Sequence, residues 1–155
     1  MSKAAQRQEA IQNIRLLCEG ETDEIALQAT VACELYRLVD GYDWVGFYRV
    51  VEPELLKIGP YQGGHGCLAI PFDRGVCGAA ARTLTTQLVP DVDAFEGHIA
   101  CASSTRSELV LPVFGAKNEL LAVLDLDSDL PDFFDTEDQL ALETLMKDLF
   151  GDVKQ

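Results

Sequence analysis

The sequence predicts an α+β domain in which one meandering antiparallel sheet is covered by helices from the two ends of the chain. Three observations carry this prediction: amphipathic helices at both ends, a run of short strands between them, and 155 residues of which 48% are hydrophobic. A chain of this length closes one hydrophobic core without crosslinks, so we interpret residues 1–155 as a single domain. We expect a ligand under the long loops, on the face away from the terminal helices.

Two helices open the chain, over residues 4–18 and 23–39. In both, apolar residues recur at helical spacing, and Thr22 precedes the second helix as its expected N-cap. Cys18 and Cys33 fall on or beside the apolar faces. A small buried hydrophobe is the expected role of a cysteine at such positions, so both are interpreted as core.

The middle of the chain has the composition of short strands interrupted by one helix. Runs of β-branched, aromatic and leucine residues bounded by glycine and proline predict strands over 44–51, 55–58, 67–70, 87–89, 109–114 and 120–126. Between them lie a flexible glycine-rich loop over 59–66, an alanine-rich helix over 76–84 and a long connection over 91–107 with little periodicity. A final helix begins with a capping box at Thr136 and closes at Gly151.

The net charge of the chain limits the classes of partner that it is expected to bind. The formal net charge is -14, from 26 acidic and 12 basic residues. A surface of this charge repels phosphate backbones and anionic lipids, so we expect neither nucleic acid nor membrane as a partner. No segment approaches the roughly 20 apolar residues of a spanning helix, and the first residues lack the apolar run of a secretory signal. We therefore expect a cytoplasmic protein, whose five cysteines serve catalysis, redox sensing or metal binding more often than structure.

Three of the cysteines stand where a thiol can be reached. Cys67, Cys77 and Cys101 each lie at a junction between a loop and an element, beside glycines or small polar residues. Cys77 lies near a helix start, where the helix dipole lowers the pKa of a thiol. A packed free thiol explains any one of them, but three together favour redox chemistry. Zinc is the competing use, with His65 and His98 as further ligands; because paired ligands at short CxxC-type spacing are absent, we expect no metal.

An acidic cluster is expected at one end of the sheet. Glu108 begins one strand, and Asp125 and Asp127 end the next on a single face, so a tight turn brings the three together. Their mutual repulsion raises the pKa of at least one, which then serves as a general acid, and the remaining charge attracts an ammonium group. Trp44 and Tyr48 alternate on one face and offer an apolar wall. A solvated strand end and simple core packing are the alternatives for these two groups.

Four motifs then point to a known family. In order they are Trp44-Val45-Gly46-Phe47-Tyr48, Gly75-Val76-Cys77-Gly78, Gly97-His98-Ile99-Ala100-Cys101 with Ser107-Glu108, and Val123-Leu124-Asp125-Leu126-Asp127-Ser128. Together they resemble the free methionine-(R)-sulfoxide reductases, single GAF-domain enzymes, along nearly the whole chain. The resemblance implies a GAF-like fold, with the terminal helices packed on one face of a mostly antiparallel sheet and with ligand-binding loops and a short helix on the other. One departure is Ala102, where members of the family commonly carry an acidic residue.

The resemblance also implies roles for the thiols. Cys101 is similar to the catalytic cysteine of the family, while Cys67, and secondarily Cys77, are similar to resolving cysteines. A Cys101 thiolate would attack the sulfoxide sulfur while a protonated carboxyl, Glu108 or one of the aspartates, protonates the departing oxygen. The resulting sulfenic acid would condense with a nearby thiol, preferentially Cys67, to a disulfide that a thioredoxin-type reductant reopens.

Substrate and partners follow from the same resemblance. Glu108, Asp125 and Asp127 are similar to the carboxylates that bind the substrate ammonium, and Trp44 to the wall near the substrate methyl group. The expected substrate is free methionine sulfoxide, with no cofactor or metal, and the expected assembly is a homodimer. Two alternatives remain open: a GAF module that senses a small ligand without turnover, and a redox-sensing thiol protein.

Overall fold

A six-stranded sheet in the order β3-β2-β1-β6-β5-β4 forms the centre of the protein in the computed structural model, which describes residues 1–154. The strands are β1 (Trp44–Glu52), β2 (Leu55–Gln62), β3 (Ala69–Pro71), β4 (Gln87–Val89), β5 (Ser107–Phe114) and β6 (Leu120–Ser128). The helices are α1 (Lys3–Leu17), α2 (Glu24–Leu38), α3 (Gly75–Thr83) and α4 (Thr136–Phe150), with a 3₁₀ turn, η1, over Val92–Ala94.

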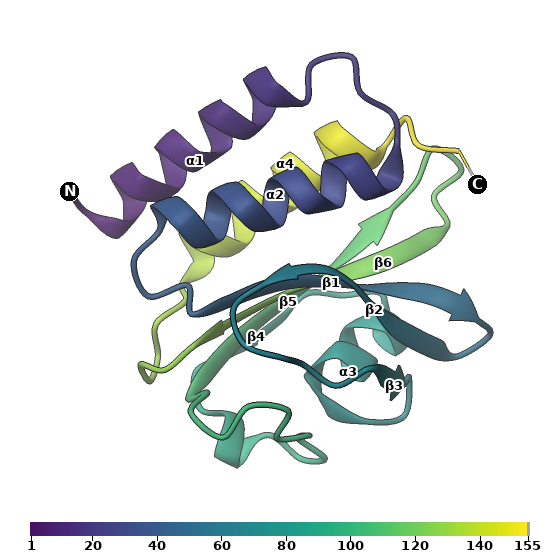
Figure 1. The fold of residues 1–155 in the computed structure, drawn as a ribbon. Helices are drawn as coiled ribbons and strands as arrows, with labels where there is room; N and C mark the ends of the chain where they lie inside the picture. The colour runs from purple at the N-terminus through teal and green to yellow at the C-terminus, as the bar shows by residue number, and fades with distance from the viewer. Residues whose placement is uncertain (155) are drawn as a thin grey trace.

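The layers match the fold class that the sequence predicts. Figure 1 shows α1, α2 and α4 together on one face of the sheet, with α3 and the long loops on the opposite face. Each strand pair in the described sheet is antiparallel. The predicted α+β, GAF-like arrangement is therefore confirmed. Within residues 1–154, no helix combines the length and the apolar character needed to cross a membrane.

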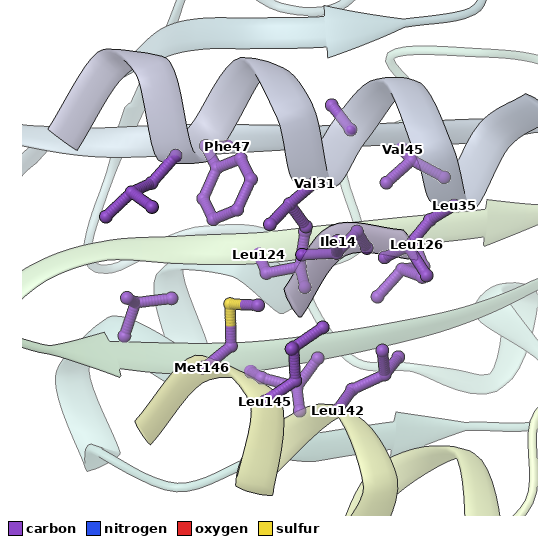
Figure 2. Packing of buried hydrophobic residues seen from close by; sticks show 14 of the residues in the cluster. Ile14, Val31, Leu35, Val45, Phe47, Leu124, Leu126, Leu142, Leu145 and Met146 are labelled. Atoms are coloured by element: carbon purple, nitrogen blue, oxygen red, sulfur yellow. The ribbon is translucent and has the colours of Figure 1, made fainter. Parts of the chain in front are cut away.

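Alternation along the strands gives the sheet two separate apolar clusters. On the helical face, side chains of α1, α2 and α4 pack against β1 and β6, as Figure 2 shows for Ile14, Val31, Phe47 and Leu124. Leu124 and Leu126 point into this cluster and are fully buried. The residues between and after them therefore face the α3 side, because successive side chains of a strand point to opposite faces.

The N-terminal caps and one cysteine differ from their predictions. The N-cap of α2 is Asp23 rather than Thr22: the Asp23 carboxylate accepts a hydrogen bond from the Ala26 amide at 2.9 Å, which satisfies an unpaired amide of the first turn. The capping box of α4 uses Asp135 and Asp138, one residue before the predicted start. Cys33 is exposed, because it projects from the solvent side of α2, while the prediction of a buried Cys18 is confirmed.

The predicted glycine-rich loop is shorter than expected. β2 continues to Gln62, where it pairs with Val45, so the loop begins at Gly63. Cys67 lies in this loop, two residues before β3, and does not begin a strand. The backbone pairing of β2 with β1 overrides the local preference of Gly59 and Pro60 for a turn.

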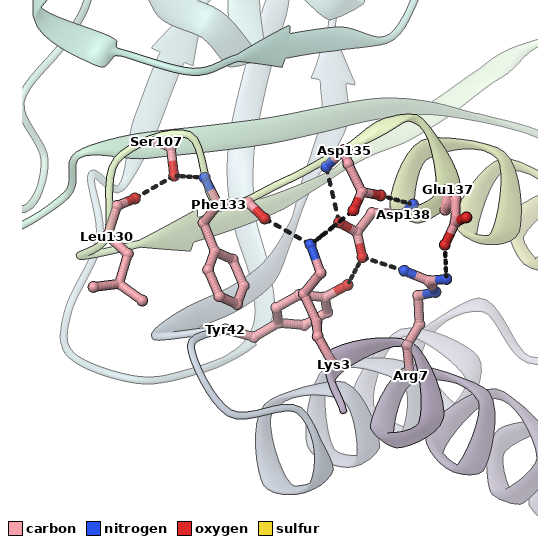
Figure 3. A network of polar contacts seen from close by, with 9 residues as sticks. All are labelled: Lys3, Arg7, Tyr42, Ser107, Leu130, Phe133, Asp135, Glu137 and Asp138. Atoms are coloured by element: carbon pink, nitrogen blue, oxygen red, sulfur yellow. Dashed lines mark hydrogen bonds and ion pairs between the residues drawn. The ribbon is translucent and has the colours of Figure 1, made fainter. Parts of the chain in front are cut away.

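A buried carboxylate fastens α1 to α4. Asp138 has no exposed surface and accepts hydrogen bonds from Lys3 Nζ at 2.7 Å, Arg7 Nη1 at 2.6 Å and Tyr42 Oη at 2.9 Å (Figure 3). The two cations come from α1, the phenol from the loop before β1, and the carboxylate from the first turn of α4. A buried charge is tolerated when it is paired and hydrogen-bonded in this way.

We therefore expect Asp138→Asn to lower the free energy of unfolding by about 3 kcal/mol, because the substitution leaves two cations facing a neutral amide. The measurement is urea denaturation at pH 7. Asp148→Asn is the matched control: Asp148 pairs with Arg15 at 2.8 Å, but both side chains are more than 40% exposed, so its loss changes stability by less than about 1 kcal/mol. Equal effects of the two substitutions would contradict the assignment of Asp138 as the fastening group.

Candidate active site

The α3 side of the sheet carries a small pocket. It is lined by side chains of β1, β5, β6 and α3 together with the loops before β3 and before β5. Seven of the eight site residues expected from the sequence line it: Trp44, Tyr48, Cys77, Cys101, Glu108, Asp125 and Asp127. The eighth, Cys67, does not. Its volume is about 40 Å³.

The three carboxylates converge as the sequence predicts. β5 and β6 pair so that Glu108 lies opposite Asp127 and Val110 lies opposite Asp125. Glu108 and Asp125 are buried, at 6% and 5% exposure, and thus they do not form a solvated strand end. Oδ1 of Asp125 and Oδ1 of Asp127 are both buried and find no hydrogen-bond partner among residues 1–154. A bound cationic donor would satisfy these two oxygens.

Burial and mutual repulsion shift the protonation of this cluster. Removal from water raises the pKa of Glu108 well above its ordinary value, and the neighbouring charges of Asp125 and Asp127 raise it further. Burial also raises the pKa of Asp127 well above its ordinary value, with Asp125 adding to the shift. The pKa of Asp125 is raised by burial as well, but contacts with Glu108 and Cys77 oppose that shift. Asp125 is therefore the member best suited to hold the negative charge, and Glu108 a member that keeps a proton.

Cys77 is not the reactive thiol that its position near a helix start suggests. It is 4% exposed, and burial raises the pKa of its thiol well above the ordinary value, with further increases from Asp125 and Glu108. These effects outweigh the N-terminal amides of α3, which the sequence-based expectation of a lowered pKa relied on. The expectation of an accessible, activated Cys77 is wrong, because the helix start faces the acidic cluster.

The other two thiols of interest form a disulfide. Cys67 and Cys101 are bonded across 34 residues of sequence, with their Cα atoms 5.4 Å apart. Both are partly buried; Cys101 lines the pocket and Cys67 approaches from the outer loop. The three remaining cysteines, Cys18, Cys33 and Cys77, are free thiols.

An aromatic stack closes one side of the pocket. The rings of Trp44 and Tyr48 lie 5.9 Å apart and nearly parallel, and both side chains face the α3 side of the sheet. Tyr61 extends the stack on the other side of Trp44, with ring centroids 5.3 Å apart. Sequence reasoning missed Tyr61 because it lay inside the predicted flexible loop; the strand alternation of β2 would have been the signal for it.

A histidine near Glu108 was also missed as part of this pocket. Nε2 of His98 lies 3.8 Å from Oε2 of Glu108, and its side chain is 16% exposed. The sequence suggested His98 only as a metal ligand. Its position in the motif before Cys101 was the available signal, since that motif runs along the pocket wall.

The absence of closely spaced metal ligands in the sequence does not by itself exclude a metal site, because the fold brings distant residues together. Cys77, Glu108 and Asp125 bring one donor atom each to within 4.8 Å of one another, although they come from three different elements. These donors hold protons more tightly than usual, so a cation would have to displace protons to bind there. The same buried negative site is equally suited to an organic ammonium group.

A family model described as "GAF domain" matches residues 21–149. The chain belongs to the GAF domain family. Among curated GAF relatives, the free methionine-R-sulfoxide reductase of Escherichia coli (strain K12) is 41% identical over 133 residues, which cover 86% of this chain and 79% of the relative. The protein of the same name from Saccharomyces cerevisiae is 36% identical, covering 91% and 84%. These relatives confirm the resemblance seen in the four sequence motifs.

Solved GAF structures agree with this placement. The X-ray structure of free methionine-R-sulfoxide reductase from Neisseria meningitidis in complex with its substrate superposes with a TM-score of 0.89 at 42% identity, covering 96% of this chain and 89% of that chain. The reduced form of the Staphylococcus aureus protein, named fRMsr, gives 0.85 at 38% identity, covering 91% and 90%.

The raised pKa of Glu108 predicts a gain of stability when its charge is removed. A carboxyl with a native pKa above its unfolded value binds more protons when folded, so folding stability falls as pH rises from about 4 through the native pKa. Glu108→Gln removes this penalty. We expect its melting temperature to exceed that of the wild type by at least about 2 °C at pH 7 to 8, and the difference to shrink toward pH 4.

The matched control is Glu52→Gln, because Glu52 is an exposed glutamate at the end of β1. Thermal melts between pH 4 and 8 should give the control the same profile as the wild type. A Glu108→Gln protein that is less stable than the wild type at every pH would mean that Glu108 is held ionised by structural contacts.

Proposed function

We propose that this protein reduces free methionine-(R)-sulfoxide to methionine, using its own thiols as the immediate reductant. The observation that carries the proposal is one pocket lined by both a disulfide-forming cysteine, Cys101, and three carboxylates, two of which are buried. The bacterial and yeast relatives that bear the name of this activity match along most of the chain. The Neisseria neighbour was solved in complex with its substrate.

The carboxylates select a free amino acid. Two unpartnered aspartate oxygens, one each on Asp125 and Asp127, receive the ammonium group of the substrate. A charge-assisted hydrogen bond to a buried carboxylate is roughly twice as strong as a neutral one, so a charged ammonium group binds there more strongly than an uncharged nitrogen. The backbone nitrogen of a methionine residue inside a peptide is uncharged and carries only one hydrogen. Trp44 and Tyr48 provide the apolar surface against which the methyl end of the substrate packs.

The chemistry at sulfur then proceeds in two steps. The Cys101 thiolate attacks the sulfoxide sulfur, and the oxygen takes a proton from Glu108, whose raised pKa keeps that proton available. The oxygen is transferred to Cys101, which becomes a sulfenic acid as methionine is released. The Cys67 thiol next attacks this sulfenic sulfur, forming the Cys67–Cys101 disulfide and releasing water.

Cys67 is the resolving thiol in this scheme. It lies within bonding distance of Cys101, whereas Cys77 is buried beside three carboxylates that disfavour its thiolate. Cys77 instead contacts Asp125 through its thiol, which stabilises the charged carboxylate. The expected secondary resolving role of Cys77 is therefore set aside in favour of a role in holding Asp125.

An external dithiol completes the cycle. The disulfide is reopened by thiol exchange, and a thioredoxin-type reductant of the cytoplasm is the proposed partner. The protein is proposed to work as a homodimer. Breaking the disulfide also removes the covalent link between the two loops that carry Cys67 and Cys101.

The activity is tested with racemic free methionine sulfoxide and dithiothreitol. We expect the purified protein to consume the R epimer only, and Cys101→Ser to abolish turnover because the nucleophile is lost. Cys33→Ser, which removes the exposed thiol of α2, should keep wild-type turnover. Substrate loss is followed by chiral chromatography. Binding of methionine sulfoxide without turnover would favour the ligand-sensing alternative, and peroxide-driven disulfide formation without turnover the redox sensor.

The division of labour between the two other thiols gives a further prediction. After one turnover without reductant, Cys67→Ser should accumulate a sulfenic acid on Cys101, because the neighbouring thiol is missing. Cys77→Ser should still form the Cys67–Cys101 disulfide. Mass spectrometry with a sulfenic-acid trap distinguishes the two products. A disulfide between Cys77 and Cys101 in the Cys67→Ser protein would assign resolution to both cysteines.

A further inference from the structure

We propose that Trp44 is a positioning residue for disulfide formation: its indole seats the glycine-rich loop that carries Cys67 and so keeps this thiol within reach of Cys101. The inference rests on the proposed function in one respect, because it takes Cys67 as the resolving thiol. It assigns to the loop over residues 63–68, between β2 and β3, a task that substrate binding does not require of it.

The indole makes a direct bond to this loop. Nε1 of Trp44 donates a hydrogen bond to the backbone carbonyl of Gly64 at 2.7 Å. Among residues 1–154 no other side chain hydrogen-bonds to the loop between Gly63 and Cys67. The next backbone tie is the Ile58 amide, which donates to the Leu68 carbonyl at 3.0 Å, on the far side of Cys67. Trp44 therefore fixes the loop on one side of Cys67 and β2 fixes it on the other.

The glycines of the loop fit the shape of the indole. A Cβ atom on Gly63 would lie 2.7 Å from Cδ1 of Trp44, and a Cβ on Gly66 would lie 3.1 Å from Cζ2 of the same ring. A Cβ on Gly64, by contrast, would meet nothing within 4 Å. Gly63 also has a φ of +117°, which side chains rarely adopt. Glycine at 63 and 66 thus permits close contact with the ring, in addition to any flexibility.

The Trp44 indole that holds the loop is itself fixed in position, because Trp44 belongs to the sheet. Trp44 is the first residue of β1, pairs with Asp127 of β6, and is only 6% exposed. Its ring is stacked between Tyr48 and Tyr61. A Cβ on Gly46 would lie 2.5 Å from Cη2 of the ring, so the β1 backbone leaves no space for it to shift in that direction. Through Trp44, the loop that carries Cys67 is therefore held against the same sheet that carries the carboxylates.

The contact between the loop and Trp44 affects the rate of the step in which Cys67 attacks the sulfenic acid of Cys101 and water leaves. The rate of such an internal reaction depends on the effective concentration of one sulfur at the other. An unseated loop samples more conformations, which lowers that concentration. A slower attack also leaves the sulfenic acid exposed longer to further oxidation.

The experiment measures the effective concentration without any substrate. The wild-type protein is equilibrated with reduced and oxidised glutathione; oxidised glutathione plus the Cys67 and Cys101 thiols gives two reduced glutathiones plus the protein disulfide. Trp44→Phe keeps an aromatic ring but loses the N–H donor, and we expect it to lower the equilibrium constant for disulfide formation about five- to tenfold. Gly63→Ala should lower it in the same direction, because the added Cβ pushes the loop off the ring.

Gly64→Ala is the matched control, one residue away and with open space for its Cβ, and it should keep the wild-type constant. Thermal melts verify that each variant is folded at the temperature of measurement. Wild-type constants in both Trp44→Phe and Gly63→Ala would overturn the proposal, as would an equal loss in Gly64→Ala. No methionine sulfoxide is present in this experiment, so its result does not depend on whether the protein has reductase activity. If the proposed reductase activity were wrong, the wild-type protein would fail to reduce methionine sulfoxide in the separate turnover assay.

Discussion

The register of β5 on β6 is the constraint on which the rest of the structure depends. It places Glu108 opposite Asp127 and turns Asp125 to the same face, while Leu124 and Leu126 enter the opposite core. A one-residue slip of β6 would turn Asp125 and Asp127 into the helical core and Leu124 and Leu126 toward the pocket. The apolar packing of α1, α2 and α4 against one face therefore fixes the register that assembles the acidic site on the other.

The acidic site is unfavourable for the fold that holds it. Burial raises the pKa of each of its three carboxyls, so their ionisation opposes folding at neutral pH. Asp138 shows the contrasting case, in which a fully buried carboxylate is matched by cations from α1 and a phenol. The protein thus contains one compensated buried acid and one uncompensated cluster. Groups left without partners in this way are typical of sites that bind a ligand of opposite charge.

Sequence patterns predicted the elements and the acidic cluster well, because strand alternation and a tight turn are local. They placed Glu108 near Asp125 and Asp127 without any knowledge of tertiary contacts. They failed for Cys77, whose thiol is controlled by charges from β5 and β6 rather than by its own helix start. They also treated the loop after Gln62 as merely flexible, since contacts between its glycines and Trp44 depend on pairing between distant strands. The features that could not be predicted are those set by neighbours remote in sequence.

On the proposed function, the substrate itself adjusts the proton donor. Without a ligand, Glu108 keeps its proton because burial and the charge of Asp125 oppose ionisation. When an ammonium group binds at Asp125 and Asp127, part of that negative charge is neutralised, and a cation close to a carboxyl favours its ionised form. The pKa of Glu108 then falls from its raised value, which makes its proton easier to release. The acid would accordingly become a better donor only when an amino acid occupies the site, and water in the empty pocket would meet an acid that holds its proton tightly.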